Sequence, residues 1–146
     1  MRTFKFRGKR VDNNEWVYGQ LVTLKVDEKT AFFIVTENDS VVDCKLPDMG
    51  VLFTLNDDMF MVRQETVGQF TELKDKAGKE IYEGDIMAIT TPISGLFDYR
   101  KVQYNDIKGA WTMRTKHIWS FLYELNNEYI VIGNIHDNPE LMKKGE

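Results

Sequence analysis

The stretch "TELKDKAGKEIYEGDI" (Thr71–Ile86) places two glycines among turn-forming residues and short apolar segments. In "LKDKAGKEI", Asp75 can accept hydrogen bonds from the backbone that follows it, and Gly78 suits the positive φ of a type I turn with a bulge. In "YEGDI", Gly84 supplies a second positive φ and Asp85 stabilises the turn. Two chain reversals this close together predict a short sheet that rolls over on itself.

The segments around these turns are short and rich in Val, Ile, Thr, Phe, Tyr and Trp, a composition typical of strands. The strands expected from this pattern are Glu15–Val26, Ala31–Thr36, Val51–Leu55, Met59–Phe70, Arg100–Asp106, Gly109–Thr115 and Glu128–Ile135. Short strands joined by tight turns are the pieces from which small barrels are built. The sequence therefore predicts an all-β, mainly antiparallel protein, with an N-terminal antiparallel β region over residues 1–66 and an SH3-like, partly open barrel over residues 67–146.

Two segments favour short helices instead of strands. In "HIWSFLYELNNE", apolar residues recur at i, i+3, i+4 and i+7, the spacing of one helix face; they are Ile118, Phe121, Leu122 and Leu125. This stripe predicts a short helical insert near residues 117–126. In "NPELM", Asn138 can cap a second helical turn, Pro139 suits its first position, and Glu140 lies where the helix dipole favours an acid.

The charge of the chain is nearly balanced. The net charge is −4, and residues 1–66 and 67–146 contribute −2 each, with 9 basic against 11 acidic and 10 against 12. A protein whose main partner is duplex phosphate usually has a basic excess, so this balance argues against sequence-independent nucleic-acid binding. A local basic cluster near the N-terminus consists of Arg2, Lys5, Arg7, Lys9 and Arg10.

Reactive and metal-binding residues are few. Cys44 is the only cysteine, so no intramolecular disulfide is expected, and a lone thiol fits a reducing cytoplasm. His117 and His136 do not form a pair with metal-ligand spacing, and no nucleophile, phosphate-loop or dinucleotide motif is present. There is no secretory signal and no apolar run of about 20 residues. We therefore expect a cytoplasmic, non-enzymatic protein without a metal, cofactor or membrane partner.

Several segments together resemble the YopX-like family of small phage and prophage proteins. They are "KFRGKRVDNNEWVYG" (Lys5–Gly19), "VGQFTELKDKAGKEIYEGDI" (Val67–Ile86), "VQYNDIKGAWTM" (Val102–Met113) and "YIVIGNIHDNPELM" (Tyr129–Met142). One departure lies at Phe70-Thr71-Glu72-Leu73, where the family more often has Thr-Gly-Leu. The resemblance implies an all-β fold with an SH3-like barrel and a phage context, hence the cytoplasm of a bacterial host cell. It brings no catalytic residues. The structural turn residues of these motifs are Gly78, Gly84, Asp85, Gly133, Asn134 and Pro139.

Three functions remain for such a module, of which an enzyme of a type without a sequence signature is the least favoured. SH3-like barrels often bind ligands on aromatic grooves, so protein contacts, including self-association into a homo-oligomer, are the first hypothesis. Nucleic-acid binding through the basic N-terminus and the barrel aromatics is the alternative. The candidate partner-binding residues are Arg7, Arg10, Trp16, Tyr18 and Trp119. Trp16 is as well suited to a small core as to a binding surface, and Trp111 favours the core.

Overall fold

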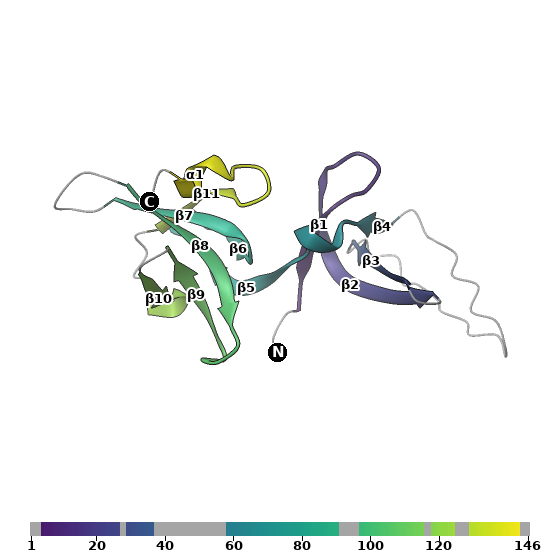
Figure 1. Cartoon of the computed structure of the whole chain (residues 1–146), viewed down its shortest axis with the longest axis horizontal. Coiled ribbons are helices and arrows are strands. Elements are labelled where there is room, and N and C mark those ends of the chain that lie inside the picture. Colours follow the sequence, from purple (N-terminus) through teal and green to yellow (C-terminus); the bar gives the residue numbers. More distant parts are fainter. Residues whose placement is uncertain are drawn as a thin grey trace. The chain divides into compact units, whose positions relative to one another are not determined.

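The computed structural model describes residues 4–26, 29–36, 58–90, 97–115, 118–124 and 129–143. The chain divides into two compact units, Phe4–Val67 and a second unit that begins at Gly68 (Figure 1). In the described part of both units, regular structure is almost entirely antiparallel strand, with one short α-helix. The all-β prediction is therefore confirmed.

The described residues of the N-terminal unit form four strands in the spatial order β4-β3-β2-β1. Their bounds are β1 Phe6–Lys9, β2 Trp16–Val26, β3 Lys29–Val35 and β4 Met59–Val62, and a 3-10 turn, η1, follows at Gln64–Thr66. The chain just after β1 also reaches β4. Val11 N–H donates to the carbonyl of Met61 at 3.0 Å, and Arg63 N–H donates to the carbonyl of Lys9 at 2.9 Å. Strand β4 is thus held from two sides.

Close packing between β1 and β4 depends on a residue without a side chain. Phe33, Ile34 and Val62 are the buried apolar residues of the unit, at 6%, 0% and 4% exposure. Gly8 lies against the last of these: a Cβ atom at Gly8 would come within 2.9 Å of Val62 Cβ. Only glycine fits such an approach without a shift of the neighbouring strand.

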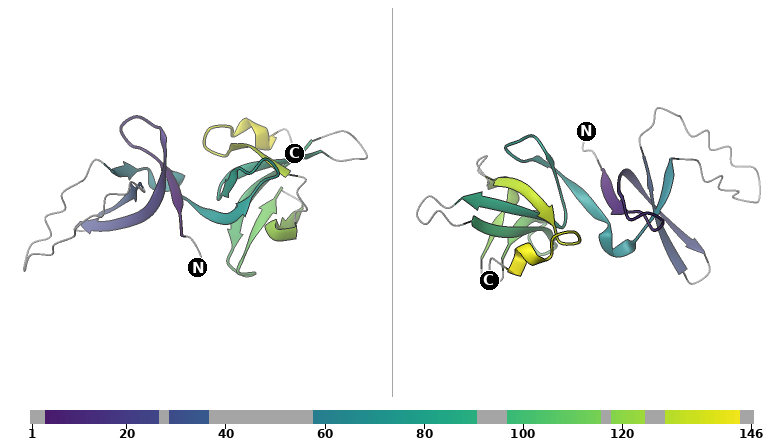
Figure 2. Two further views of the ribbon diagram at one scale, coloured as in Figure 1. Left: turned by 180° about the vertical axis from the view of Figure 1, so that it is seen from behind. Right: turned by 90° about the horizontal axis from the view of Figure 1, so that it is seen from above.

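The C-terminal unit has a hairpin and an open five-stranded sheet (Figure 2). The hairpin strands are β5 Gly68–Lys74 and β6 Glu80–Tyr82. The five-stranded sheet has the order β10-β9-β8-β7-β11, with β7 Asp85–Thr90, β8 Phe97–Asn105, β9 Ala110–Arg114, β10 Trp119–Phe121 and β11 Tyr129–Asn134. Helix α1 spans Glu140–Lys143, directly after Pro139 as predicted. Among the described strands no sheet closes into a barrel.

The core of the C-terminal unit gathers apolar side chains from the hairpin and from the sheet. Its buried members are Ile81, Met87, Val102, Met113, Leu122 and Tyr129. Partly buried Trp111 packs against this cluster, as the core interpretation of that residue predicts. Burial of side chains from so many strands fixes the curvature with which the sheet wraps around its own core.

Both glycines of the Thr71–Ile86 stretch have the predicted backbone conformation. Gly78 has φ +83° and Gly84 has φ +82°. Asp85 is almost fully buried, and its Oδ2 accepts a hydrogen bond from Tyr82 N–H at 2.8 Å. The two reversals predicted from the sequence are thus present, and the second is stabilised by a buried carboxylate.

Two predicted elements are wrong. Residues near 117–126 do not form a helix in their described part, because β10 pairs with β9 and a single 3-10 turn, η2, follows at Leu122–Glu124. The segment Met59–Phe70 is not one strand, since β4 ends at Val62 and η1 separates it from β5. Val51–Leu55, Cys44 and His117 lie outside the described residues.

Candidate functional site: an aromatic row on an uncovered strand edge

Three aromatic side chains follow one another along β10 and η2. Trp119 and Phe121 make an edge-to-face contact, with ring centroids 5.4 Å apart and an interplanar angle of 90°. Phe121 and Tyr123 are stacked, at 5.2 Å and 19°. Trp119 is 50% exposed and Tyr123 is 66% exposed. We call these three residues the aromatic row. Contiguous exposed apolar surface of this kind is typical of an interaction site.

The aromatic row lies on the outermost strand of the five-stranded sheet. Thr115 N–H donates to the carbonyl of Ile118 at 2.8 Å, so that pair faces inward between β9 and β10. Inward and outward backbone groups alternate along an antiparallel strand. The backbone groups of Trp119 and Phe121 therefore point away from β9, toward an edge beside which the described residues place no further strand.

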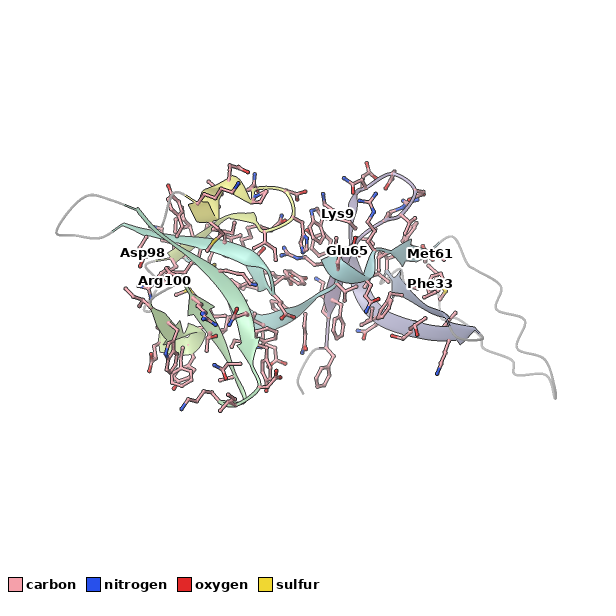
Figure 3. The ribbon with its side chains drawn as sticks, viewed as in Figure 1. Lys9, Phe33, Met61, Glu65, Asp98 and Arg100 are labelled. Atoms are coloured by element: carbon pink, nitrogen blue, oxygen red, sulfur yellow. The ribbon has the colours of Figure 1, made fainter. Side chains whose placement is uncertain are left out.

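Strand β10 is fixed to the sheet from its other face. Arg100 on β8 donates from Nη1 to Ser120 Oγ at 2.9 Å. The same guanidinium is held by Asp98, which accepts from Nε at 2.7 Å (Figure 3). Both partners of this ion pair are largely shielded, with side chains 13% and 23% exposed. The edge strand that presents the aromatic row is thus attached to the sheet by a side-chain hydrogen bond as well as by its pairing with β9.

The opposite edge of the same sheet is covered. On β11, Val131 N–H donates to Asp75 Oδ2 at 2.9 Å, and the carbonyl of Tyr129 accepts from Lys76 N–H at 3.3 Å. Both partners belong to the turn of the β5–β6 hairpin. The predicted turn residues therefore do more than reverse the chain, because they satisfy the outer backbone groups of an edge strand.

The Asp75 carboxylate is the centre of this cover. Its Oδ1 accepts hydrogen bonds from the backbone N–H groups of Ala77 and Lys79, each at 2.9 Å. Desolvation alone would raise the pKa of the Asp75 carboxyl, but the backbone donors of Val131, Lys79 and Ala77 outweigh it and hold that pKa below its usual value. The charged form of Asp75 is therefore the form that stabilises the turn.

A groove lies beside the aromatic row on the outer face of the sheet. Its volume is about 320 Å³, and its lining consists of Gln103, Asn105, Thr112, Arg114, Thr115, Ile118 and Trp119. The lining contains amides, hydroxyls and one guanidinium but no carboxylate. This composition suits polar or acidic groups of a partner whose apolar part contacts Trp119.

The predicted N-terminal binding residues form a different arrangement. Tyr18 lies opposite Arg7, and Trp16 lies opposite Lys9, across the β1–β2 pair. The guanidinium of Arg7 is 4.7 Å from the ring centroid of Trp16, and the ammonium of Lys9 is 5.5 Å from it. Arg7 and Lys9 are only 5% and 8% exposed. The two cations thus stabilise a buried aromatic contact rather than a solvated basic surface.

Arg10 does not join that arrangement. Its guanidinium lies 4.2 Å from the ring centroid of Phe60. Two hydrogen bonds, at 2.9 and 2.5 Å, join it to the carboxylate of Asp12. The bond to Asp12 raises the pKa of Arg10, and the bond to Arg10 lowers the pKa of Asp12. The charge of Arg10 is therefore matched by a neighbouring acid.

The candidate residues fall in both units. Arg7, Trp16 and Tyr18 lie together in the N-terminal unit, and Trp119 lies in the C-terminal unit. Phe121 and Tyr123 were missed, because the stripe of apolar residues favoured a helix. The i, i+2 spacing of Trp119 and Phe121 suits one side of an extended segment and could have identified Phe121. The position of Tyr123 follows from η2, which the spacing does not predict.

The "GNIHDNP" segment (residues 133–139) forms a tight loop that is tied to the Gly84 turn. Asn134 Oδ1 accepts hydrogen bonds from His136 and Asp137 N–H, both at 2.9 Å. Ile135 N–H donates to the carbonyl of Gly84 at 2.9 Å. A Cβ atom at Gly133 would lie 2.4 Å from Asn138 Oδ1. The side chain of Asn134 and the close approach of Gly133 to Asn138 thus hold the backbone of this loop in place.

The described ranges contain no group of three or more His, Cys, Asp or Glu residues that could hold a metal ion. In the same part of the chain, no helix is long and apolar enough to cross a membrane. The aromatic row and the groove beside it offer hydrogen bonding, aromatic contact and the exposed guanidinium of Arg114.

Comparison with known proteins identifies the family. The model of the family described as YopX protein matches residues 5–143. Protein EF1440 from Enterococcus faecalis has a similar solved structure, with a TM-score of 0.58, 24% identity, and coverage of 97% of this chain and 99% of that one. Protein yopX from Bacillus subtilis has a TM-score of 0.53 at 17% identity and covers 97% of both chains. No curated protein matches. Because the family match spans nearly the whole sequence, the chain belongs to the YopX protein family.

Proposed function

We propose that this chain is a non-enzymatic protein-binding or self-assembling module of a phage or prophage, acting in the cytoplasm of its bacterial host. The observation that carries the proposal is the aromatic row, exposed on the one edge of the five-stranded sheet that the β5–β6 turn does not cover. Aromatic residues supply much of the binding energy of protein interfaces. An uncovered strand edge adds backbone donors and acceptors to the same surface.

The charges of the N-terminal unit favour this proposal over nucleic-acid binding. Phosphate contacts need exposed cations, whereas Arg7 and Lys9 are buried beside Trp16. Arg10 is bound to Asp12. Three of the five basic residues near the N-terminus are therefore buried or paired with an acid, which favours protein contacts as the function.

Site-specific photo-crosslinking in the host cell tests the proposal. A photoreactive phenylalanine analogue replaces Tyr123, at the end of the aromatic row. The matched control places the same analogue at Ile107, which is 93% exposed on the β8–β9 turn and lies outside the row. If exposure alone decided crosslinking, Ile107 would react more than Tyr123, which is 66% exposed.

We expect discrete protein adducts from position 123, of this chain with itself or with another protein, and few from position 107. Adducts that are equally abundant at both positions would contradict a role for the row. Adducts to nucleic acid from position 123, with no protein adduct, would make the alternative function correct.

A further inference from the structure

We infer that the occupant of the β10 edge is the β10 strand of a second copy of this chain, paired antiparallel about a two-fold axis at Ser120. This inference rests on the proposed function and specifies its partner. Joining two edges in this way would extend each five-stranded sheet into its copy. A two-fold contact of this kind is isologous, so the same strand must complement itself.

The backbone of β10 meets that requirement. Trp119 and Phe121 direct their backbone groups outward, as the inward Thr115–Ile118 bond shows. The carbonyl of Phe121 is used at the start of the 3-10 turn η2, whose bonds run from residue i to i+3. The outward groups that remain are therefore the N–H and carbonyl of Trp119 and the N–H of Phe121.

A two-fold axis at Ser120 brings Phe121 opposite Trp119 of the copy. The N–H of Phe121 then donates to the carbonyl of Trp119 in the copy, and the symmetric bond forms in return. Each chain contributes one donor, the N–H of Phe121, and one acceptor, the carbonyl of Trp119, so the symmetric contact contains two hydrogen bonds. An axis centred on Phe121 would set its N–H against the copy's Phe121 carbonyl, which η2 already uses. An axis centred on Trp119 would pair that residue with itself and leave the N–H of Phe121 without an acceptor on the β10 strand of the copy.

The side chains of β10 also suit a copy of themselves. The strand reads Trp-Ser-Phe and carries none of the charged residues that commonly block an exposed edge. Trp119 and Phe121 lie on the same face, so each meets the other type across the axis, and cross-strand aromatic pairs are favourable. Ser120 lies on the opposite face, where Arg100 already binds it.

The size of the contact predicts a reversible dimer. Strand β10 has only 3 residues, far less than the roughly 20–30 residues a side of a standard stable interface. We therefore expect monomer at a few micromolar and dimer at some hundreds of micromolar, rather than a permanent assembly.

Sedimentation velocity of the full chain from about 5 to about 500 μM tests this inference. Phe121→Pro removes the outward N–H, and proline is tolerated where that group faces away from the sheet. Phe121→Leu is the matched control, since it keeps the N–H and an apolar side chain. Trp119→Lys supplies a second variant that does not depend on proline, because an edge lysine opposes strand addition.

We expect the wild type and Phe121→Leu to dimerise, with Phe121→Leu weakened by less than about tenfold, and Phe121→Pro and Trp119→Lys to remain monomeric across the range. In the wild type, hydrogen exchange of the Phe121 amide should slow as concentration rises. A wild type that is monomeric throughout would overturn the inference, and so would a dimer that neither variant affects. If the wild type is monomeric throughout, crosslinks from the photoreactive analogue at position 123 to a different protein would still support the proposed function.

Discussion

At the scale of single residues, the left-handed backbone conformation decides where substitutions are tolerated. Gly78 has φ +83°, and a Cβ atom placed there would meet nothing within 4 Å. Gly78→Ala therefore adds backbone strain without a clash, and we expect the free energy of unfolding to fall by about 1–2 kcal/mol. Gly78→Asn should lose less, because asparagine tolerates this conformation. Chemical denaturation measures both, and equal losses would contradict a purely conformational cause.

At Glu72, by contrast, a residue other than glycine has the left-handed backbone conformation. Glu72 has φ +67°, at the irregularity where the pairing of β5 with β6 shifts register. We expect Glu72→Gly to raise the free energy of unfolding by about 0.5–1 kcal/mol, because relief of strain exceeds the entropy cost of glycine. Glu72→Ala controls for loss of the side chain's own contacts, and it should not stabilise. If alanine stabilised as much as glycine, the φ angle would not be the cause.

At the scale of elements, the turn of the β5–β6 hairpin depends on the charge of Asp75. Three backbone N–H groups donate to its carboxylate. Asp75→Asn should lower the free energy of unfolding by about 1–2 kcal/mol at pH 7, since hydrogen bonds to a charged acceptor are the stronger ones. Asp106→Asn, on an exposed turn, removes the same charge from a residue outside this network and should change little.

The difference in the free energy of unfolding between wild type and Asp75→Asn should decrease as the pH falls. The pKa of Asp75 is lower in the folded chain than its usual value of 3.8. Its contribution is therefore fully present above about pH 4 and is lost as the pH falls through the folded pKa. The stability curves of wild type and Asp75→Asn should converge below pH 4. Curves that stay parallel down to about pH 2 would show that the carboxylate charge is not what holds the turn.

The contact between β1 and β4 gives a second prediction for elements. Gly8→Ala would place a Cβ atom 2.9 Å from Val62 Cβ. We expect a loss of about 1–3 kcal/mol in the free energy of unfolding, as is usual for overpacking. Val62→Ala should be destabilising alone, but in combination with Gly8→Ala it should cost less than the sum of the two single changes. Additive losses in thermal or chemical denaturation would contradict direct contact between these two positions.

The conformation of the two turns could be predicted from the sequence, whereas that of the segment near residues 117–126 could not. Positive φ at Gly78 and Gly84 follows from local turn chemistry, which a sequence displays directly. The apolar stripe from Ile118 to Leu122 matches a helix face, yet its members are not buried together: Ile118 is 54% exposed and Leu122 is 2% exposed. Pairing with β9 outweighs a weak helical preference in so short a segment.

The exposure of the aromatic row and the burial of Arg7 and Lys9 could not be predicted from the sequence either, because both depend on long-range strand pairing. Whether Arg7 lies in solvent or beside Trp16 depends on which strand pairs with β1, and a basic cluster in a sequence does not show that pairing. The exposure of Trp119 depends on β10 being the last strand of its sheet. Strand order is determined by long-range packing, so local sequence patterns do not predict it and the structure is needed to show it.

At the scale of the whole molecule, the distribution of charge separates protein contacts from nucleic-acid binding. The five basic residues of the N-terminus could neutralise at most about five phosphates, which would give a log–log salt slope near −4 to −5 on duplex DNA. Burial of Arg7 and Lys9 and the pairing of Arg10 with Asp12 remove three of those charges from the count. At most about two phosphates then remain, for a slope no steeper than about −2.

Fluorescence anisotropy with a labelled duplex, between about 25 and about 200 mM salt, measures this slope. We expect weak binding throughout, and we expect Arg7→Ala combined with Arg10→Ala to leave it unchanged, because neither guanidinium faces a phosphate. Tryptophan emission of the double variant checks that loss of the Arg7 contact with Trp16 has not unfolded the unit. A slope near −4 to −5 that falls by about two in the double variant would instead assign the N-terminal unit to DNA. It would also place the basic residues in solvent, against their burial in the structure.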